Sequence, residues 1–305
     1  MSNMAVSICG VEMKNPVIAA SGTFGFGREY AEYFDISKLG GISCKGLTLE
    51  PRPGNPPPRI AETPSGILNA VGLQNPGAEK FLSDELPWMK RRDTAIIANI
   101  AGRDVEEYRR LAKRLSDSEV DMIELNISCP NVREGGAAFG ATCESAATVT
   151  AAARQVCAKP LMVKLSPNVT SIADIARAVE AAGADAISLI NTLMGMRIDI
   201  TTRRPILRNN TGGLSGGAVF PVAVRMVSEV RRAVKVPVVG MGGITRWSDG
   251  IEMMMAGADA IQVGTALFAD PLAPVKIIDG MNQWLDDHNI ANMGDIVGTA
   301  ELWQF

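Results

Sequence analysis

The stretch AGADAIQVGTAL (residues 256–267) contains the pattern that decides the fold. Its Ala-Gly-Ala-Asp segment is typical of the end of a helix, because glycine readily adopts the left-handed conformation that stops a helix. The apolar run that follows at once is too short for a helix of usual length and predicts a buried strand. A second Ala-Gly-Ala-Asp segment (residues 182–185) leads directly into another apolar run, so the helix-to-strand unit is repeated.

Short apolar runs rich in valine and isoleucine recur along the chain, and each ends in small or polar residues. Continuous apolar strands indicate burial on both faces, as in a parallel sheet covered by helices. Eight strands alternating with helices predict an α/β fold of the (β/α)8 TIM barrel type, with a doubly wound open sheet as the alternative. The predicted strands are residues 16–22, 40–46, 95–102, 122–130, 161–167, 186–192, 236–244 and 260–267.

Helical patterns lie between these strands. Asp104 is placed to cap a helix whose apolar face repeats at Val105, Tyr108, Leu111 and Leu115. The other predicted helices are residues 141–157, 171–182, 219–234, 246–256 and 271–287.

Three stretches depart from the simple alternation. Residues 47–80 hold a proline cluster, residues 193–218 are rich in glycine, and residues 130–140 form a third long connection. Long excursions in a compact domain are usually functional loops or lids. We expect extra loops and short strands above the C-terminal mouth of the barrel. No linker composition divides the chain, so residues 1–305 are predicted to form one catalytic domain.

Composition excludes several classes of function. The net charge of -3 and the pI of about 5.4 leave no electrostatic footprint for nucleic acid. No run reaches the roughly 18 apolar residues of a membrane span, and no secretory signal opens the chain, so a cytoplasmic protein is expected. The five cysteines form no CxxC pair, which argues against disulfides, zinc and iron–sulfur clusters in this chain. No metal site and no Rossmann GxGxxG turn is found.

Polar residues gather at the C-terminal ends of the predicted strands, where the active sites of TIM barrels are built. The lysines among them are costly to desolvate unless they meet anionic or acceptor groups, and they indicate an electron-rich ligand. Gly242, Gly243 and Gly264 follow the last two strands, where such barrels frequently bind phosphate. The strand-end polar residues are Ser21, Lys45, Asn99, Asn126, Ser128, Cys129, Lys164, Asn191, Thr192 and Thr265.

Cys129 is the candidate for reaction chemistry, because it follows a strand into a loop beside the expected ligand. A thiol with an ordinary pKa near 8.5 can act as a general base at neutral to mildly alkaline pH. The remaining cysteines are interpreted as small buried apolar residues, and His288 as a surface residue far from every strand end. These cysteines are Cys9, Cys44, Cys143 and Cys157.

Three motifs resemble dihydroorotate dehydrogenase: SCKGLTLEPRPGNPPPR (43–59), NAVGLQNPG (69–77) and NISCPN (126–131). The resemblance covers essentially the whole chain and is strongest to the class 1B catalytic subunits, which use NAD through a partner subunit. Cysteine at position 129 separates the chain from class 2, in which serine is the base. The Pro-rich stretch 51–58 and the segment 191–199 favour class 1B over the fumarate-linked class 1A, which stays open as an alternative.

The resemblance implies one FMN per chain and a set of binding residues. Cys129 would be the catalytic base, and the family's partner subunit would carry FAD and a 2Fe-2S cluster, in a heterotetramer built on a homodimer of catalytic chains. The implied FMN-binding residues are Ser21, Lys45, Gly46, Asn99, Asn126, Lys164, Ile190, Gly216, Gly242, Gly243, Gly264 and Thr265. The implied dihydroorotate-binding residues are Lys45, Asn69, Ala70, Val71, Gly72, Leu73, Asn126, Asn191 and Thr192.

Other interpretations remain open from the residues alone. A Schiff-base aldolase could use Lys164 as its nucleophile. A fragment of dihydropyrimidine dehydrogenase is a further flavoenzyme alternative, and a barrel that only binds a nucleotide would leave the strand-end lysines without a purpose. Arg197 stands where the family pattern suggests a small residue, which could alter the loop above the substrate.

Overall fold

The computed structural model describes residues 2–128 and 139–303. In this described part of the chain, eight parallel strands close into a barrel in sequence order, with the last strand paired to the first. The prediction of a TIM barrel is therefore confirmed, and the open sheet is excluded. The barrel strands are β3 (Val17–Ala19), β4 (Gly41–Ser43), β7 (Ala95–Ile100), β8 (Met122–Asn126), β9 (Leu161–Lys164), β10 (Ala186–Leu189), β15 (Val238–Met241) and β16 (Ala260–Val263).

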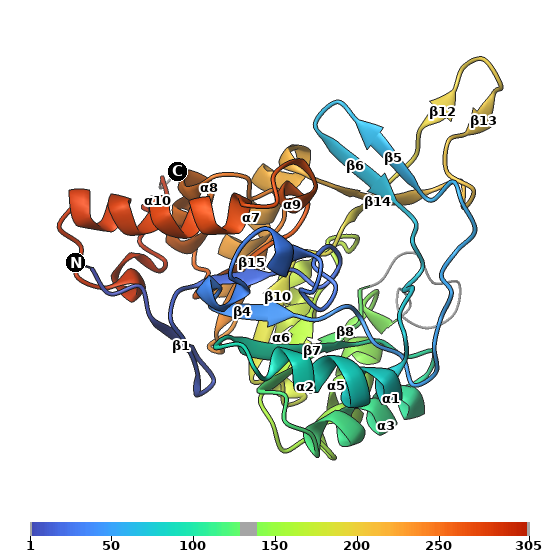
Figure 1. The fold of residues 1–305 in the computed structure, drawn as a ribbon, viewed down its shortest axis with the longest axis horizontal. Coiled ribbons are helices and arrows are strands. Elements are labelled where there is room, and N and C mark those ends of the chain that lie inside the picture. Colours follow the sequence, from blue (N-terminus) through green and yellow to red (C-terminus); the bar gives the residue numbers. More distant parts are fainter. Residues whose placement is uncertain (1, 129–138, 304–305) are drawn as a thin grey trace.

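Helices surround the barrel and cover its outer face (Figure 1). The Asp104 side chain accepts a hydrogen bond from the Glu107 N–H and caps α3, as the sequence predicts. Gly257, with φ of 123°, ends α8 and leads into β16. The larger helices are α3 (Val105–Ser116), α5 (Cys143–Arg154), α6 (Ile172–Ala181), α7 (Phe220–Arg231), α8 (Trp247–Met255) and α10 (Ala273–Asp287).

The helical segment between β4 and β7 is not among the sequence predictions. It consists of α1 (Ala78–Lys80), a π-helical turn η3 (Phe81–Glu85) and α2 (Leu86–Met89). Pro87 stands in the first turn of α2, where its missing N–H is tolerated, and the interrupted pattern hides the segment from a search for regular periodicity. The other short helices are η1 (Tyr30–Glu32), η2 (Ile36–Lys38), η4 (Gly217–Val219), α9 (Ala266–Ala269) and η5 (Met293–Ile296).

The barrel interior changes from apolar to polar toward the C-terminal ends of its strands. The hairpin β1 (Val6–Ile8) and β2 (Val11–Met13) packs Ile8 and Met13 against the N-terminal end. The apolar layer above it comes from alternate strands and holds Ile18, Ile97, Met162 and Val239. The next layer, from the other four strands, holds Ser43, Glu124, Ser188 and Gln262. The top layer holds Ala20, Asn99, Lys164 and Met241.

The two long excursions pair with each other above the mouth. Strands β5 (Ile60–Thr63) and β6 (Gly66–Asn69) come from the first, and β11 (Leu193–Gly195) and β14 (Gly212–Ser215) come from the second. They form one antiparallel sheet in the order β11-β14-β6-β5, so the expectation of short strands above the mouth is confirmed. The hairpin β12 (Ile198–Asp199) and β13 (Arg204–Pro205) extends from this sheet to the far corner of the molecule (Figure 1).

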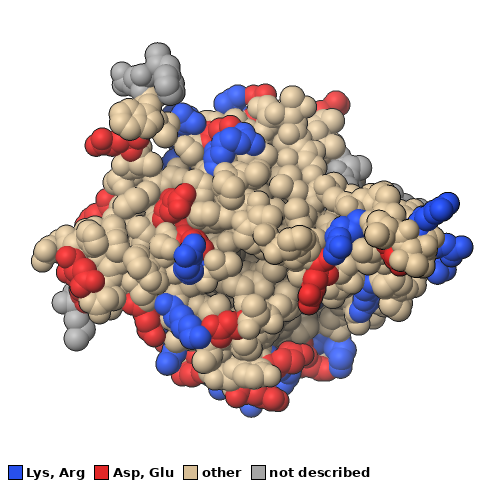
Figure 2. Space-filling view, turned by 90° about the horizontal axis from the view of Figure 1, so that it is seen from above, with Lys and Arg blue, Asp and Glu red and all other residues tan. Residues whose placement is uncertain are grey.

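The surface carries charges of both signs. Figure 2 shows Lys and Arg side chains interspersed with Asp and Glu on one face, around a broad uncharged area. No helix within the described ranges is long and apolar enough to cross a membrane.

Candidate active site

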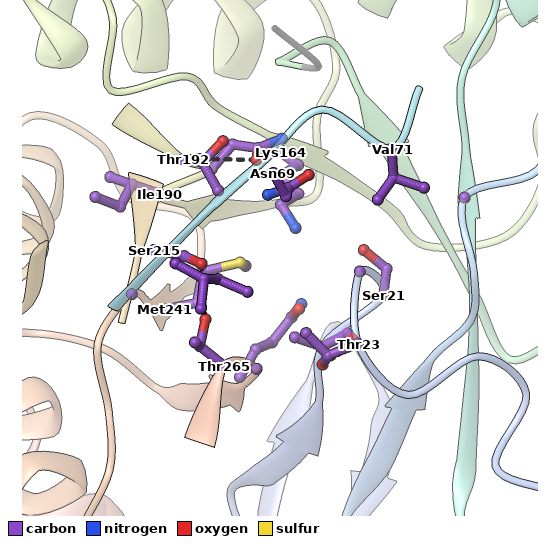
Figure 3. A pocket seen from close by; sticks show the side chains of 18 of the residues that line it. Ser21, Thr23, Asn69, Val71, Lys164, Ile190, Thr192, Ser215, Met241 and Thr265 are labelled. Atoms are coloured by element: carbon purple, nitrogen blue, oxygen red, sulfur yellow. Dashed lines mark hydrogen bonds between the residues drawn. The ribbon is translucent and has the colours of Figure 1, made fainter. Parts of the chain in front are cut away.

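A pocket lies at the C-terminal ends of the barrel strands, beneath the sheet β11-β14-β6-β5. In Figure 3, side chains from several elements surround one open centre: Lys164 and Thr192 on one side, Ser215 and Thr265 on another, and Ser21 opposite them. Most of the residues predicted from the strand ends and the family motifs lie here. Those that line the pocket are Ser21, Lys45, Gly46, Asn69, Val71, Gly72, Leu73, Asn99, Asn126, Lys164, Ile190, Asn191, Thr192, Gly242, Gly243, Gly264 and Thr265.

Three of the predicted residues that the structure describes do not line the pocket: Ala70, Ser128 and Gly216. Ser128 is buried beside the pocket, where it hydrogen-bonds to Asn126 and Asn191. Ala70 points away from the pocket and packs with Leu68 and Leu207 in a small apolar cluster. Gly216, with φ of 105°, follows the lining residue Ser215, and a Cβ atom there would lie 2.5 Å from the Gly66 Cα atom. The sequence alone does not separate Ala70 from its neighbours Asn69, Val71, Gly72 and Leu73, which do line the pocket.

Cys129 and the greater part of the loop 130–140 lie outside the described residues. The other cysteines differ from one another. Burial raises the pKa of the Cys9 thiol to about 11, with Asp185 and Asp259 adding to the effect, and the fully buried Cys44 is shifted in the same direction. Cys143 is exposed, so its interpretation as a buried apolar residue is wrong. It opens α5, where the helix turns this position toward solvent.

Glu124 lies at the centre of the polar layer beneath the pocket. Its side chain is fully buried and accepts four hydrogen bonds. Oε2 accepts from Ser43 Oγ at 2.7 Å and from Asn99 Nδ2 at 2.6 Å. Oε1 accepts from Ser188 Oγ and from Gln262 Nε2, both at 2.8 Å.

This carboxylate is held in its ionised form. Burial alone would raise the pKa of Glu124, but the charge of Lys164 and the hydrogen bonds to the carboxylate outweigh burial, so the pKa is lowered. Lys164 is only 6% exposed, and no Asp or Glu stands among the described residues that line the pocket. Glu124 therefore supplies the negative charge that balances a buried lysine at the site.

A chain of hydrogen bonds runs from Glu124 to the rim. Asn99 Oδ1 accepts from Asn126 Nδ2 at 3.4 Å, and Asn126 Oδ1 accepts from Ser128 Oγ at 2.8 Å. Asn191 Nδ2 donates to Ser128 Oγ at 2.8 Å. These contacts fix the asparagine side chains of three barrel strands in one arrangement, so their orientations are set before a ligand arrives.

The loops after β15 and β16 form the glycine-rich side of the pocket. Gly243 has φ of 76°, and a Cβ atom there would lie 2.7 Å from the Phe220 N atom and 2.8 Å from the Gly216 O atom. Backbone in this conformation can direct N–H groups at an anion. Thr265 Oγ1 donates to Ser215 Oγ at 2.8 Å and ties this side to the sheet above the mouth.

The Pro-rich segment supports the loop 69–73. Asn55 donates from its backbone N–H to Val71 O and from Nδ2 to Ala70 O, both at 2.9 Å. Arg197, the departure from the family pattern, is exposed and donates to Glu62 O at 2.6 Å. It thereby ties the second excursion to β5 without entering the pocket.

Sequence reasoning missed several lining residues, among them Thr23, Ser215, Phe268 and Gln262. Gln262 carried a usable signal, because a polar amide inside an apolar strand needs a partner. Thr23 stands in a turn, Ser215 ends the short strand β14 and Phe268 lies in the short helix α9, and the local sequence pattern does not tell which of these side chains face the mouth.

Fold and site together define a TIM-barrel enzyme with a cationic, amide-rich pocket at the C-terminal mouth, next to glycine loops suited to phosphate. Within the described ranges, no group of three or more His, Cys, Asp or Glu side chains is placed to hold a metal ion. The family model for dihydroorotate dehydrogenase matches residues 3–285, and the chain belongs to that family.

Curated relatives agree with this membership. The chain is 53% identical over 300 residues to the dihydroorotate dehydrogenase B (NAD(+)) catalytic subunit of Pelobacter propionicus, covering 98% of this chain and 99% of that protein. The same-named protein of Geobacillus kaustophilus is 54% identical over 301 residues, with coverage of 98% and 96%. That of Bacteroides fragilis is 52% identical over 303 residues, with coverage of 99% and 100%.

Proposed function

We propose that this chain is the FMN-containing catalytic subunit of an NAD-linked dihydroorotate dehydrogenase, which oxidises dihydroorotate to orotate in pyrimidine (UMP) biosynthesis. The observation that carries the proposal is the convergence of Lys45, Lys164 and the asparagine chain beside the glycine loops of the last two barrel strands. The family and the names of the relatives agree with it.

The residues of the pocket fit FMN. Gly264 leaves space on the pocket side at the end of β16, where a Cβ would lie no closer than 3.4 Å to any neighbour. The Gln262 Oε1 atom is buried and accepts no hydrogen bond within the described part of the chain, as expected of a group that meets a ligand donor. Lys164 offers a positive charge to an electron-rich ring. FMN would be held by the twelve residues that the resemblance implies, of which all but Gly216 line the pocket.

The roles of the protein groups follow from the resemblance and from the chemistry of their side chains. FMN, when bound, supplies the hydride acceptor, its N5 atom, for the hydrogen on C6 of dihydroorotate. Cys129 would remove the proton from C5. Asn69, Asn126 and Asn191 would pair with the imide edge of the substrate, since an amide offers both donor and acceptor. Lys45 would donate charge-assisted hydrogen bonds near substrate and flavin.

The electrons taken from dihydroorotate must be passed on to NAD, and we propose that a partner subunit does this. The relatives are named catalytic subunits of an NAD(+)-linked enzyme, and we extend both properties to this chain. The proposed partner subunit carries FAD and a 2Fe-2S cluster and returns the electrons to NAD. Residues 1–305 would act as one catalytic domain, in a homodimer within a heterotetramer.

The first experiment is a visible absorption spectrum of the purified chain, before and after anaerobic addition of dihydroorotate. Flavin bands that bleach on addition support cofactor and substrate together. NAD reduction that needs a co-expressed partner subunit supports the NAD-linked class, whereas fumarate reduction by the chain alone would replace it with the fumarate-linked class. A protein that stays colourless and inert after incubation with FMN would overturn the proposal, and borohydride trapping on Lys164 would then support an aldolase.

A further inference from the structure

Gln262 occupies an unusual position for a buried amide. It lies on β16, is 1% exposed, and lines the pocket two residues before Gly264. Its Nε2 atom donates to Glu124 Oε1 at 2.8 Å, whereas its Oε1 atom accepts nothing within residues 2–128 and 139–303. A buried acceptor without a donor costs free energy, so a native site usually supplies one.

Glu124 determines which end of the amide faces the pocket. An ionised carboxylate can only accept hydrogen bonds, so the NH2 group of Gln262 must face it and the carbonyl oxygen must face away. Asn99 is oriented by the same rule, because its Nδ2 atom donates to Glu124 Oε2 at 2.6 Å. The two amides differ in one respect: Asn99 Oδ1 accepts from Asn126, whereas Gln262 Oε1 is left for a ligand.

We propose that Gln262 is a cofactor-binding residue that accepts a hydrogen bond from a ribityl hydroxyl of FMN, and that Glu124 is the positioning residue that turns its carbonyl toward the pocket. This inference rests on the FMN part of the proposed function. Neither residue belongs to the binding set that the family motifs imply.

The position of Gln262 on β16 indicates that its partner is the ribityl chain of FMN rather than the flavin ring. Two residues along a strand span about 7 Å, so Gln262 lies roughly that far below the glycine loop that would hold the phosphate. The ribityl chain is the part of FMN that follows the phosphate, and it carries three O–H donors. The oxidised flavin ring has a single N–H donor, N3, at its far end from the phosphate.

The test combines a change in the protein with a change in the ligand. FMN, an analogue with an unsubstituted phosphopentyl chain, and 3-methyl-FMN are titrated by flavin fluorescence against wild type, Gln262→Met and Glu124→Gln. Gln283→Met is the matched control, because Gln283 is an exposed glutamine outside the pocket lining whose Nε2 atom donates to Asp287 Oδ1 on the same helix, α10. The measured quantity is the ratio of the Kd of each analogue to the Kd of FMN.

We expect the ratio of the Kd of the phosphopentyl analogue to the Kd of FMN to be about tenfold lower in Gln262→Met than in wild type and control. The variant weakens FMN binding by one buried hydrogen bond, which the analogue does not form in either protein. Glu124→Gln should lower the same ratio, because an amide at position 124 can donate and lets Gln262 reverse. An unchanged ratio in Gln262→Met overturns the inference, and so does a fall confined to 3-methyl-FMN. Should Glu124→Gln fail to fold, as judged by circular dichroism, the Gln262→Met ratio decides alone. Wild-type protein that binds no FMN would instead refute the proposed function.

Discussion

Replacing Glu124 with leucine removes the negative charge beneath the pocket and leaves Lys164 as a buried cation. The side chain of Glu124 is fully buried and that of Lys164 nearly so, and four donors lose their acceptor at the same time. Removing one partner of a buried charge pair costs about 3–5 kcal/mol, because the remaining charge is uncompensated. We expect Glu124→Leu to lower the free energy of unfolding by that amount and Tm by on the order of 10 °C.

The assay is urea unfolding of the FMN-free protein, followed by circular dichroism, for wild type, Glu124→Leu, Lys164→Met and the double variant. The double variant should lower the free energy of unfolding by at least about 1 kcal/mol less than the sum of the single changes, because it removes both charges.

The lowered pKa of Glu124 adds a pH dependence. The contribution of Glu124 to the free energy of unfolding is present above the unfolded pKa of about 4.3 and is lost as pH falls through the folded pKa. The difference between wild type and Glu124→Leu should therefore be constant from pH 7 to about pH 5 and shrink below about pH 4.3. A single-variant cost under about 1 kcal/mol at pH 7, or strict additivity, would refute the charge-pair argument.

Three further predictions follow from individual contacts. Cys129→Ala should retain FMN and orotate binding but lose most turnover at neutral pH, and unchanged turnover in a steady-state assay would remove Cys129 as the base. Gly243→Ala places a methyl group 2.7 Å from the Phe220 N atom in a left-handed backbone, so the loop must shift; fluorescence titration should show FMN binding at least tenfold weaker, and equal affinity would exclude the loop as the phosphate site. Tyr108→Phe removes the hydroxyl that donates to Asn126 O at 2.7 Å and should cost about 1 kcal/mol in urea unfolding with little change in KM, whereas a large rise in KM would place Tyr108 in substrate binding.

The barrel could be predicted because each of its strands is marked by a pattern of neighbouring residues in the sequence. Each strand is a short apolar run that ends in a polar or small residue, and the parallel topology brings those ends to one mouth whatever lies between them. The mouth sheet could not be predicted in this way. Its central pairing joins residues 67–69 to residues 213–215, and the register of that contact depends on two loops that have no common local pattern. Ala70 shows the same limit, since the alternation of β6 that turns it from the pocket is set by this long-range pairing.

The residues of the polar layer beneath the pocket are visible in the sequence, but only the register of the barrel strands shows that they lie together. Each of the four strands β4, β8, β10 and β16 carries one polar residue in this layer, and these strands alternate with the other four around the barrel. The four polar residues are Ser43, Glu124, Ser188 and Gln262. In a TIM barrel such positions share one layer, so a single carboxylate can meet the other three across the interior. An acid in the middle of a buried strand must be paired, and its partners should be sought in the alternate strands rather than nearby in sequence. Because alternate strands share a layer, these four polar residues form one hydrogen-bonded group that supports Lys164 and Asn99 in the layer above.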